Sequence, residues 1–203
     1  MKKVTKERIL KIALHEFALK GYRQTTTRDI LTKADANIAA ISYYFGNKDG
    51  LYTEILKTIL EKLGHILEDI AKQADPELNH KKSGQLLKAY IHKLVSLVCS
   101  DKLNSDMCMI YIREYMEPSA QYKTLFTDFN DLYRGLFIDL LIRAHKKKLS
   151  FQEASLSAVM FFSFIFTLYT RRNMIQKSMM WTDYTDSAQS EIENMLYRSL
   201  NLA

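Results

Sequence analysis

The chain contains few of the residues that interrupt regular secondary structure or crosslink a small domain. Its 203 residues include two prolines, six glycines and two cysteines. A chain with so little proline and glycine, of which 47% is hydrophobic and 26% charged, is neither disordered nor collagen-like. Two cysteines without a recognisable secretory leader favour a reducing, cytoplasmic setting, because no disulfide framework is needed.

The glycines and histidines are spaced too widely for the common ligand-binding motifs. Even the closest two glycines are separated by three residues, so neither G-x-G-x-x-G nor G-x-x-x-x-G-K-[ST] can be written. The five histidines form no H-E-x-x-H, and the sequence contains no C-x-x-C. We therefore expect no metal ion, no cofactor and no catalytic residue. An enzyme with a basic N-terminal segment stays as the less favoured alternative, with Cys99 and Cys108 as a conceivable redox pair.

Positive charge is concentrated in the first fifty residues. This segment has ten basic and five acidic residues, a net charge of +5 out of +6 for the whole chain. Neutralisation of phosphates by lysine and arginine supplies most of the sequence-independent affinity for DNA. The distribution of charge therefore favours DNA as a partner, although a solvated basic surface would produce the same pattern.

Hydrophobic residues recur every three to four positions along most of the chain, and no segment shows sustained β alternation. This periodicity predicts an all-α protein. The helices are expected at residues 5–20, 27–34, 38–44, 48–71, 86–99, 106–116, 120–144, 152–173 and 186–200. The polar run 73–85 is expected to separate two of them.

Capping residues mark the ends of the first three helices. Thr26 and Asp29 have the spacing of a capping box, and Asn37 can cap the following helix. Gly21 and Gly46 stand where helix C-termini favour a left-handed residue. A longer helix followed by two short ones joined by a tight turn predicts a helix-turn-helix, in which the last short helix lies in the DNA major groove.

The third helix has two turns with which to contact DNA. Periodicity places Ile38, Ile41 and Phe45 inside. Small side chains on the outer face let the backbone approach base edges and offer methyl contacts to thymine, whereas hydroxyls and cations can bind bases or phosphates. The residues expected to contact DNA are Thr25, Thr27, Arg28, Ala39, Ala40, Ser42, Tyr43, Tyr44 and Lys48.

These residues stand in an order that resembles a known family. The patterns I-L-x-x-A-x-x-x-F-x-x-x-G-Y-x-x-T-T (9–26), R-D-I (28–30) and A-x-I-S-Y-Y-F-x-x-K-x-x-L (39–51) are similar to the DNA-binding domain of TetR-family transcriptional regulators. Asp35 departs from the glycine found in many relatives, and Ser42 from the common aromatic residue. Residues 37–45 and the pattern R-E-x-x-x-P-S-x-x-Y (113–122) also resemble the CecR-like branch of that family.

The resemblance implies an all-α homodimer with an N-terminal helix-turn-helix domain and a C-terminal helical domain for ligand binding and dimerisation. On this basis we expect domains at 1–50 and 51–203, connected through the helix at 48–71. The two late helices, 154–173 and 186–200, are the expected dimer interface. The resemblance also implies a repressor that a small organic effector releases from a pseudo-palindromic operator of double-stranded DNA.

Two features of the C-terminal part leave alternatives open. The apolar stretch 154–170 has the minimum length for a membrane span but is interrupted by serine and threonine, so a helix buried against a partner subunit is favoured and no membrane is expected. Aromatic and sulfur-containing residues between Met107 and Phe137 are typical of a core as well as of a ligand cavity. We assign no ligand residues there. An architectural DNA-binding protein without an effector is therefore the main alternative.

Overall fold

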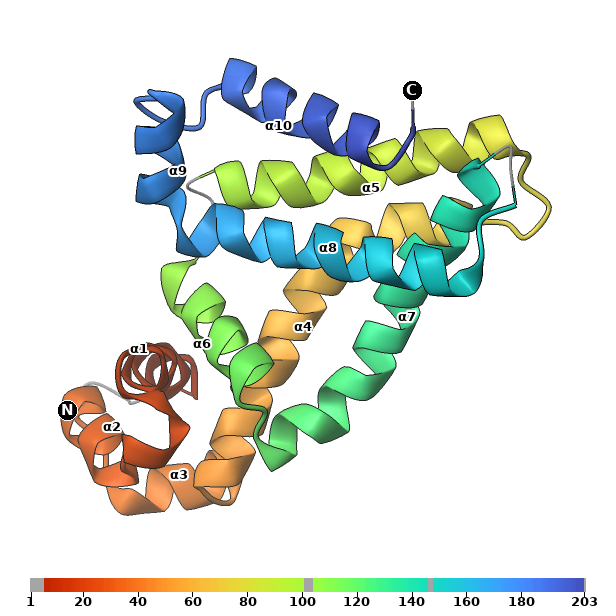
Figure 1. The fold of residues 1–203 in the computed structure, drawn as a ribbon. Helices are drawn as coiled ribbons and strands as arrows, with labels where there is room; N and C mark the ends of the chain where they lie inside the picture. The colour runs from red at the N-terminus through yellow and green to blue at the C-terminus, as the bar shows by residue number, and fades with distance from the viewer. Residues whose placement is uncertain (1–5, 101–103, 146–147, 203) are drawn as a thin grey trace. The chain divides into compact units, whose positions relative to one another are not determined.

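The computed structural model describes residues 6–100, 104–145 and 148–202, which form ten helices and no strand (Figure 1). This arrangement confirms the predicted all-α class. The helices are α1 (Lys6–Gln24), α2 (Thr27–Ala34), α3 (Ile38–Phe45), α4 (Lys48–Gln73), α5 (His80–Cys99), α6 (Ser105–Met116), α7 (Ala120–Ala144), α8 (Phe151–Thr170), α9 (Arg172–Met179) and α10 (Asp186–Ser199).

The chain divides into two compact units, each with its own hydrophobic core. Unit 1 comprises residues 1–63 and 104–129, and unit 2 comprises 64–103 and 130–203. Unit 1 therefore contains α1 to α3, the beginning of α4, α6 and the beginning of α7, because α6 packs against α1. Helices α4 and α7 each continue from one unit into the other, so the chain provides two helical connections between them.

Local capping explains why the first helices begin where the sequence predicts. Thr26 accepts a hydrogen bond from the Asp29 backbone N–H, and the Asp29 carboxylate accepts one from the Thr26 backbone N–H, which confirms the capping box at the start of α2. The Asn37 side chain accepts from the Ala40 backbone N–H over 3.1 Å and caps α3. Helix α2 has the predicted bounds, and α3 is one residue longer than predicted.

The largest differences from the sequence prediction concern α1, α5 and the end of α8. Helix α1 reaches Gln24 across a kink at Gly21, whose φ of 80° and ψ of 165° are accessible to glycine but lie outside the left-handed helical region. Helix α5 begins at His80 instead of residue 86, because Asn79 caps it by accepting from a backbone N–H. The helix predicted to end at residue 173 ends at Thr170, and the short helix α9, which periodicity did not indicate, follows it.

Helix α8 is the most apolar element of unit 2. Its 20 residues have a mean hydropathy of 1.4 over an 18-residue window, which by length and composition alone would suffice to cross a membrane. A single helix of this kind is weak evidence for a membrane span, since core helices and interface helices of globular proteins pass the same test. Ala158, Phe161 and Leu168 face the core of unit 2.

Candidate nucleic-acid interface

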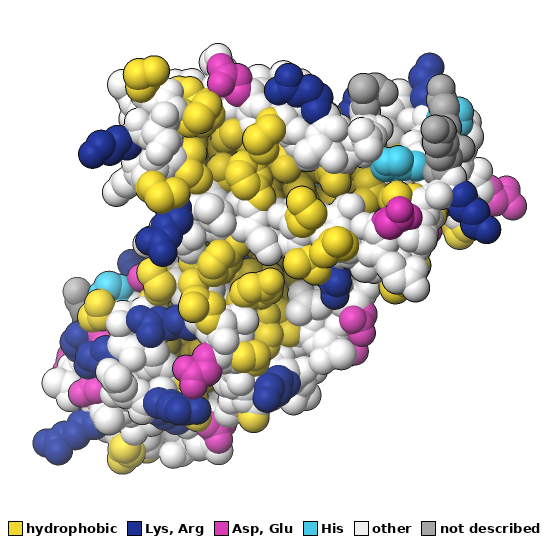
Figure 2. Space-filling view, in the orientation of Figure 1, with side chains coloured by type: hydrophobic (Ala, Val, Ile, Leu, Met, Phe, Trp, Pro, Cys, Tyr) yellow, Lys and Arg dark blue, Asp and Glu magenta, His cyan; other side chains and the backbone are white. Residues whose placement is uncertain are grey.

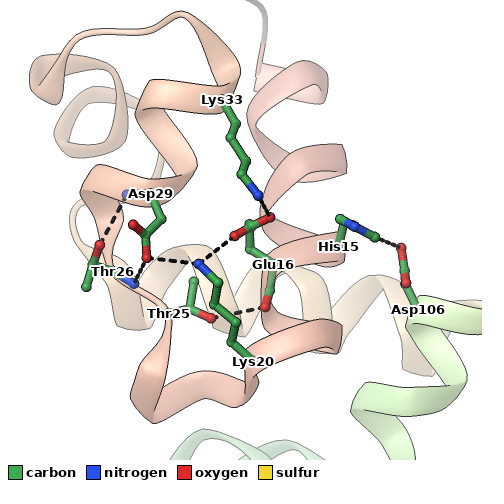
Figure 3. A network of polar contacts seen from close by, with 8 residues as sticks. All are labelled: His15, Glu16, Lys20, Thr25, Thr26, Asp29, Lys33 and Asp106. Atoms are coloured by element: carbon green, nitrogen blue, oxygen red, sulfur yellow. Dashed lines mark hydrogen bonds and ion pairs between the residues drawn. The ribbon is translucent and has the colours of Figure 1, made fainter.

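An ionic network around the buried Glu16 joins the first two helices of unit 1 (Figure 3). The Glu16 carboxylate is fully buried and lies 2.5 Å from the Lys33 ammonium and 3.0 Å from the Lys20 ammonium. Lys20 also contacts the Asp29 carboxylate at 3.3 Å. The hydrogen bond from Lys33, together with Lys20, holds the pKa of Glu16 below its usual range despite burial. The network therefore fixes α2 on α1.

The turn between α2 and α3 is tight because Asp35 adopts a left-handed conformation. Its φ of 52° and ψ of 50° lie in the region that glycine, asparagine and aspartate tolerate best. The Asp35 backbone N–H donates to the carbonyls of Leu31 and Thr32 and closes α2. The departure from glycine at this position is therefore compatible with the helix-turn-helix geometry.

The end of α3 packs closely against the start of α4. The Asn47 side chain accepts from the Gly50 backbone N–H over 2.8 Å, which caps α4. A β-carbon at Gly50 would overlap the carbonyl oxygen of Phe45, so this close approach requires glycine. The first turn of α4 thereby fixes the C-terminal end of α3.

Lys48 and Asp49, at the beginning of α4, both contact Tyr22 of α1. The Lys48 ammonium lies 4.4 Å from the centre of the Tyr22 ring, a cation–π contact. The Tyr22 hydroxyl donates to the Asp49 carboxylate. Burial and this carboxylate raise the pKa of Tyr22 to about 12, so its ring stays neutral beneath the lysine. The Lys48 side chain is half-buried and held at the edge of the α3–α4 junction.

Several predicted contact residues are exposed. Ala39, Ser42 and Tyr43 are exposed on one side of α3, and the Tyr43 side chain is 82% exposed. Arg28 is exposed in the first turn of α2, and Thr27 before it is half-buried. The helical spacing of three and four residues brings the α3 residues onto one face.

The structure corrects the prediction at four positions. Thr25 is buried, and its hydroxyl donates to the carbonyls of Glu16 and Gly21 at 3.1 and 2.8 Å, so its side chain is not available to a phosphate. Ala40 and Tyr44 were expected outside but are half-buried against the core of unit 1. Ile38 was expected inside but is 69% exposed, because Ile41 occupies the core position of this short helix.

Much of the positive charge predicted for the reading surface is neutralised within unit 1. Lys20 and Lys33 belong to the Glu16 network. Lys6 pairs with Glu54 at 2.6 Å, and Arg23 lies 3.5 Å from Glu117. The count of basic residues therefore overstates the number of cations that can contact phosphates.

Helix α6 contacts the helix-turn-helix through residues that were not predicted as part of a site. Arg113 donates to the Leu19 carbonyl at 3.2 Å. The buried Glu114 carboxylate accepts from the Tyr52 hydroxyl at 2.6 Å and from the Ser119 backbone N–H at 2.7 Å. In the sequence, the R-E-x-x-x-P-S pattern (113–119) was the one signal for these contacts. In the structure its residues contact α1 and α4.

The aromatic residues between Met107 and Phe137 belong mostly to the two cores. Tyr122 stacks on Phe126 with ring centres 3.6 Å apart in unit 1, and Phe137 stacks on Phe161 at 4.6 Å in unit 2. Met116 of the same stretch is 74% exposed. Within the described residues, no group of three or more histidine, cysteine, aspartate or glutamate side chains could hold a metal ion.

Comparison with known proteins finds similar features in bacterial regulatory proteins. The family model "Bacterial regulatory proteins, tetR family" matches residues 9–55, from α1 into α4. The HTH-type transcriptional dual regulator CecR of Shigella flexneri is 29% identical over 122 residues, which cover 58% of this chain and 54% of CecR. The matched region thus spans about half the length of this curated relative.

Solved structures match the fold over nearly the whole chain. The FadR regulator of Bacillus subtilis, in complex with stearoyl-CoA, has a TM-score of 0.63 at 18% identity and covers 97% of both chains. AibR in complex with isovaleryl coenzyme A and operator DNA has a TM-score of 0.68 at 14% identity, covering 95% of this chain and 96% of AibR. Residues 9–55, which contain the helix-turn-helix of unit 1, therefore match the tetR family of bacterial regulatory proteins, and the fold of the chain is that of the solved structures.

Proposed function

We propose that the protein is a DNA-binding transcriptional regulator that reads its operator with the exposed face of α3. The observation that carries this proposal is the local geometry of unit 1. Ala39, Ser42 and Tyr43 are exposed on a short helix that is capped at its start and fixed at its end by the first turn of α4, where Lys48 lies, and Arg28 is exposed on α2. A helix held in this way fits the major groove and can present few but well-positioned contacts.

The proposed regulator acts as a homodimer in the cytoplasm. Leu156, Val159 and Met160 form an exposed apolar strip on α8, between 46 and 66% exposed. Apolar side chains also gather over the α8 region of unit 2 in the space-filling view (Figure 2). A second copy would cover this strip, with α8 and α10 of both subunits forming a four-helix interface. The two copies of α3 would then reach successive major grooves about 34 Å apart, which requires a pseudo-palindromic operator.

A small organic effector is proposed to release the protein from DNA. The FadR and AibR structures are complexes with acyl-coenzyme A ligands, so acyl-coenzyme A thioesters are the first compounds to test here. Helices α4 and α7 continue between the two units, and α6 is part of the compact unit that holds α3. A ligand that prefers one conformation of unit 2 would change DNA affinity by the same factor by which DNA changes ligand affinity.

The alternative is an architectural DNA-binding protein without an effector. Such a protein would bind DNA but need no ligand-dependent state. Thermal unfolding in the presence of acyl-coenzyme A thioesters and a wider small-molecule set separates the two, because a ligand of the folded state raises the unfolding temperature. A screen in which no compound shifts unfolding would favour the architectural function.

Operator binding tests the proposal directly. Fragments of genomic DNA that the full-length protein retains are sequenced, and affinity for the selected site is measured by fluorescence anisotropy. Lys48→Ala should weaken binding and lower the slope of log K against log salt concentration by about one, because a phosphate contact is lost. Tyr43→Ala should weaken binding to the selected site more than binding to unrelated DNA.

Two matched variants control for folding and charge. Lys57→Ala removes an exposed lysine farther along α4, and Tyr115→Ala removes an exposed tyrosine on α6. Both should retain wild-type affinity. Equal affinity of all four variants would contradict the contact surface, and failure of the wild-type protein to retain any duplex at low salt would contradict the function itself.

A further inference from the structure

The exposed face of α3 is unusually poor in hydrogen-bonding side chains for a surface that reads bases. Ile38 and Tyr43 are 69% and 82% exposed, and Ala39 and Ser42 complete the face. Between residues 38 and 45 the helix has no arginine, lysine, asparagine, glutamine, aspartate or glutamate. The side-chain oxygen of Asn37, just before the helix, accepts the N-capping hydrogen bond from the Ala40 backbone N–H. Helix α3 itself therefore lacks the bidentate donors that distinguish guanine and adenine in the major groove.

The remaining chemistry favours one base. In the major groove only thymine presents a methyl group, and apolar side chains contact it. Ile38 and Ala39 are adjacent at the N-terminal end of α3, which is the end whose residues approach base edges in a helix-turn-helix. An isolated exposed isoleucine would need no explanation, but Ile38 lies beside a second apolar residue on the face with which we propose that the protein contacts DNA.

We infer that Ile38, assisted by Ala39, recognises the C5 methyl groups of thymines, so that the operator base pairs beneath the start of α3 are A·T pairs. This inference rests on the function proposed above and adds to it the chemical basis of sequence selection. The Ser42 and Tyr43 hydroxyls, one turn farther along, supply hydrogen bonds to neighbouring bases or phosphates without restricting the base to guanine.

Removal of single methyl groups from DNA tests the inference. Each thymine of the selected operator is replaced in turn by deoxyuridine, which differs only by the C5 methyl, and affinity of the full-length protein is measured. One or two positions in each half-site should lose about fourfold in affinity, the value expected for one buried methyl group. At the same positions, the thymine is next replaced by cytosine, which changes the A·T pair to G·C. Methylation of this cytosine at C5 should then raise the affinity by about the same factor, because it restores the methyl group at the same place.

A double-mutant cycle assigns the effect to the residue. The deoxyuridine penalty is the factor by which affinity falls when deoxyuridine replaces the thymine. In Ile38→Ala this penalty should be less than about 1.5-fold at the affected position, because the methyl group no longer has its protein contact. Leu19→Ala is the matched control, because Leu19 is an aliphatic residue of α1 with 61% exposure, and it should retain the full penalty. Circular dichroism of both variants verifies that the helices are intact.

The outcomes separate this inference from the function on which it rests. Wild-type protein that selects no DNA would overturn the proposed regulator and the inference together. Tight operator binding without a deoxyuridine effect at any thymine would overturn only the inference. A penalty that persists unchanged in Ile38→Ala would also overturn the assignment to this side chain, whereas loss of the penalty in that variant alone supports it.

Discussion

Replacement of Tyr52 by phenylalanine should destabilise unit 1 although it removes only one oxygen atom. Tyr52 is 2% exposed, and its hydroxyl donates to the Glu114 carboxylate, which is 3% exposed. The ring packs against Phe17 and Tyr22 with centres 4.8 Å apart in both cases, and phenylalanine would keep these contacts. The variant therefore isolates one hydrogen bond between α4 and α6.

The expected loss of stability follows from the buried Glu114 carboxylate, which loses a hydrogen-bond donor in Tyr52→Phe. Hydrogen bonds to charged groups contribute about 1.5–3 kcal/mol, and a buried acceptor that loses its donor incurs a desolvation penalty. Glu114 keeps the hydrogen bond from the Ser119 backbone N–H at 2.7 Å, so part of the carboxylate stays satisfied. We therefore expect a loss of about 2 kcal/mol, which corresponds to about a 30-fold increase in the population of opened unit 1.

Hydrogen exchange measured by mass spectrometry is the suitable assay. The single tryptophan, Trp181, lies in unit 2, so its fluorescence does not report directly on unit 1. Peptides from α1 and α6 should exchange about 30-fold faster in Tyr52→Phe, and the effect should be smaller in a Glu114→Gln background, which has no buried charge to strand. Tyr43→Phe, at an exposed tyrosine, is the control and should leave exchange unchanged. Exchange within twofold of wild type in unit 1 of Tyr52→Phe would refute the reasoning.

Further expectations concern acid stability, the α2–α3 turn and assembly. Because Lys33 lowers the pKa of Glu16, the Glu16 carboxylate stabilises the fold above about pH 4.3, and this stabilisation disappears as the pH falls through the lower native pKa. In Glu16→Gln, the urea concentration at the unfolding midpoint should therefore depend less on pH in the acid range. Parallel curves of urea midpoint against pH for the variant and the wild type would contradict this. Asp35→Ala should lower the free energy of unfolding by about 1 kcal/mol, because alanine is strained in the left-handed conformation of residue 35. Asp35→Gly should not lower it, because glycine adopts this conformation without strain. Equal urea midpoints for the two variants would contradict the role of backbone strain. Leu156→Glu should shift the sedimenting species from dimer to monomer, whereas Leu132→Glu, a comparably exposed leucine on α7, should not.

Local signals predicted the helices of unit 1 well because their caps depend on neighbouring residues. Thr26 and Asn37 each need only a backbone N–H three residues later, so the sequence contains the whole interaction. Helix α5 was predicted to begin too late because its first turns are polar and lack a periodic apolar stripe. Helix α9 directly follows α8, and the sequence prediction continued α8 through its first residues to residue 173.

Side-chain orientation was harder to predict than helix position. In a helix of eight residues, a spacing of three and four fits more than one choice of inner face, and the choice of Ile38 over Tyr44 was wrong. The hydroxyl of Thr25 was expected on the surface, but it is buried and donates to the carbonyls of Glu16 and Gly21 in α1. Ion pairs such as Lys6 with Glu54 depend on residues distant in the sequence, so a count of charges could not reveal them.

The family pattern combines residues that hold α3 in place with residues of its exposed face. Of the pattern residues, Thr25 is buried, Tyr44 packs on the core and Phe45 makes the close approach at Gly50. These residues hold α3 in place, which is why the pattern predicts the class of protein. Ala39, Ser42 and Tyr43 also belong to the pattern, but they are exposed on the face from which bases would be read, and Ile38 beside them lies in the segment that resembles the CecR-like branch. The scaffold residues can therefore identify a reading helix without determining the base sequence it reads, which depends on the side chains that the scaffold leaves exposed.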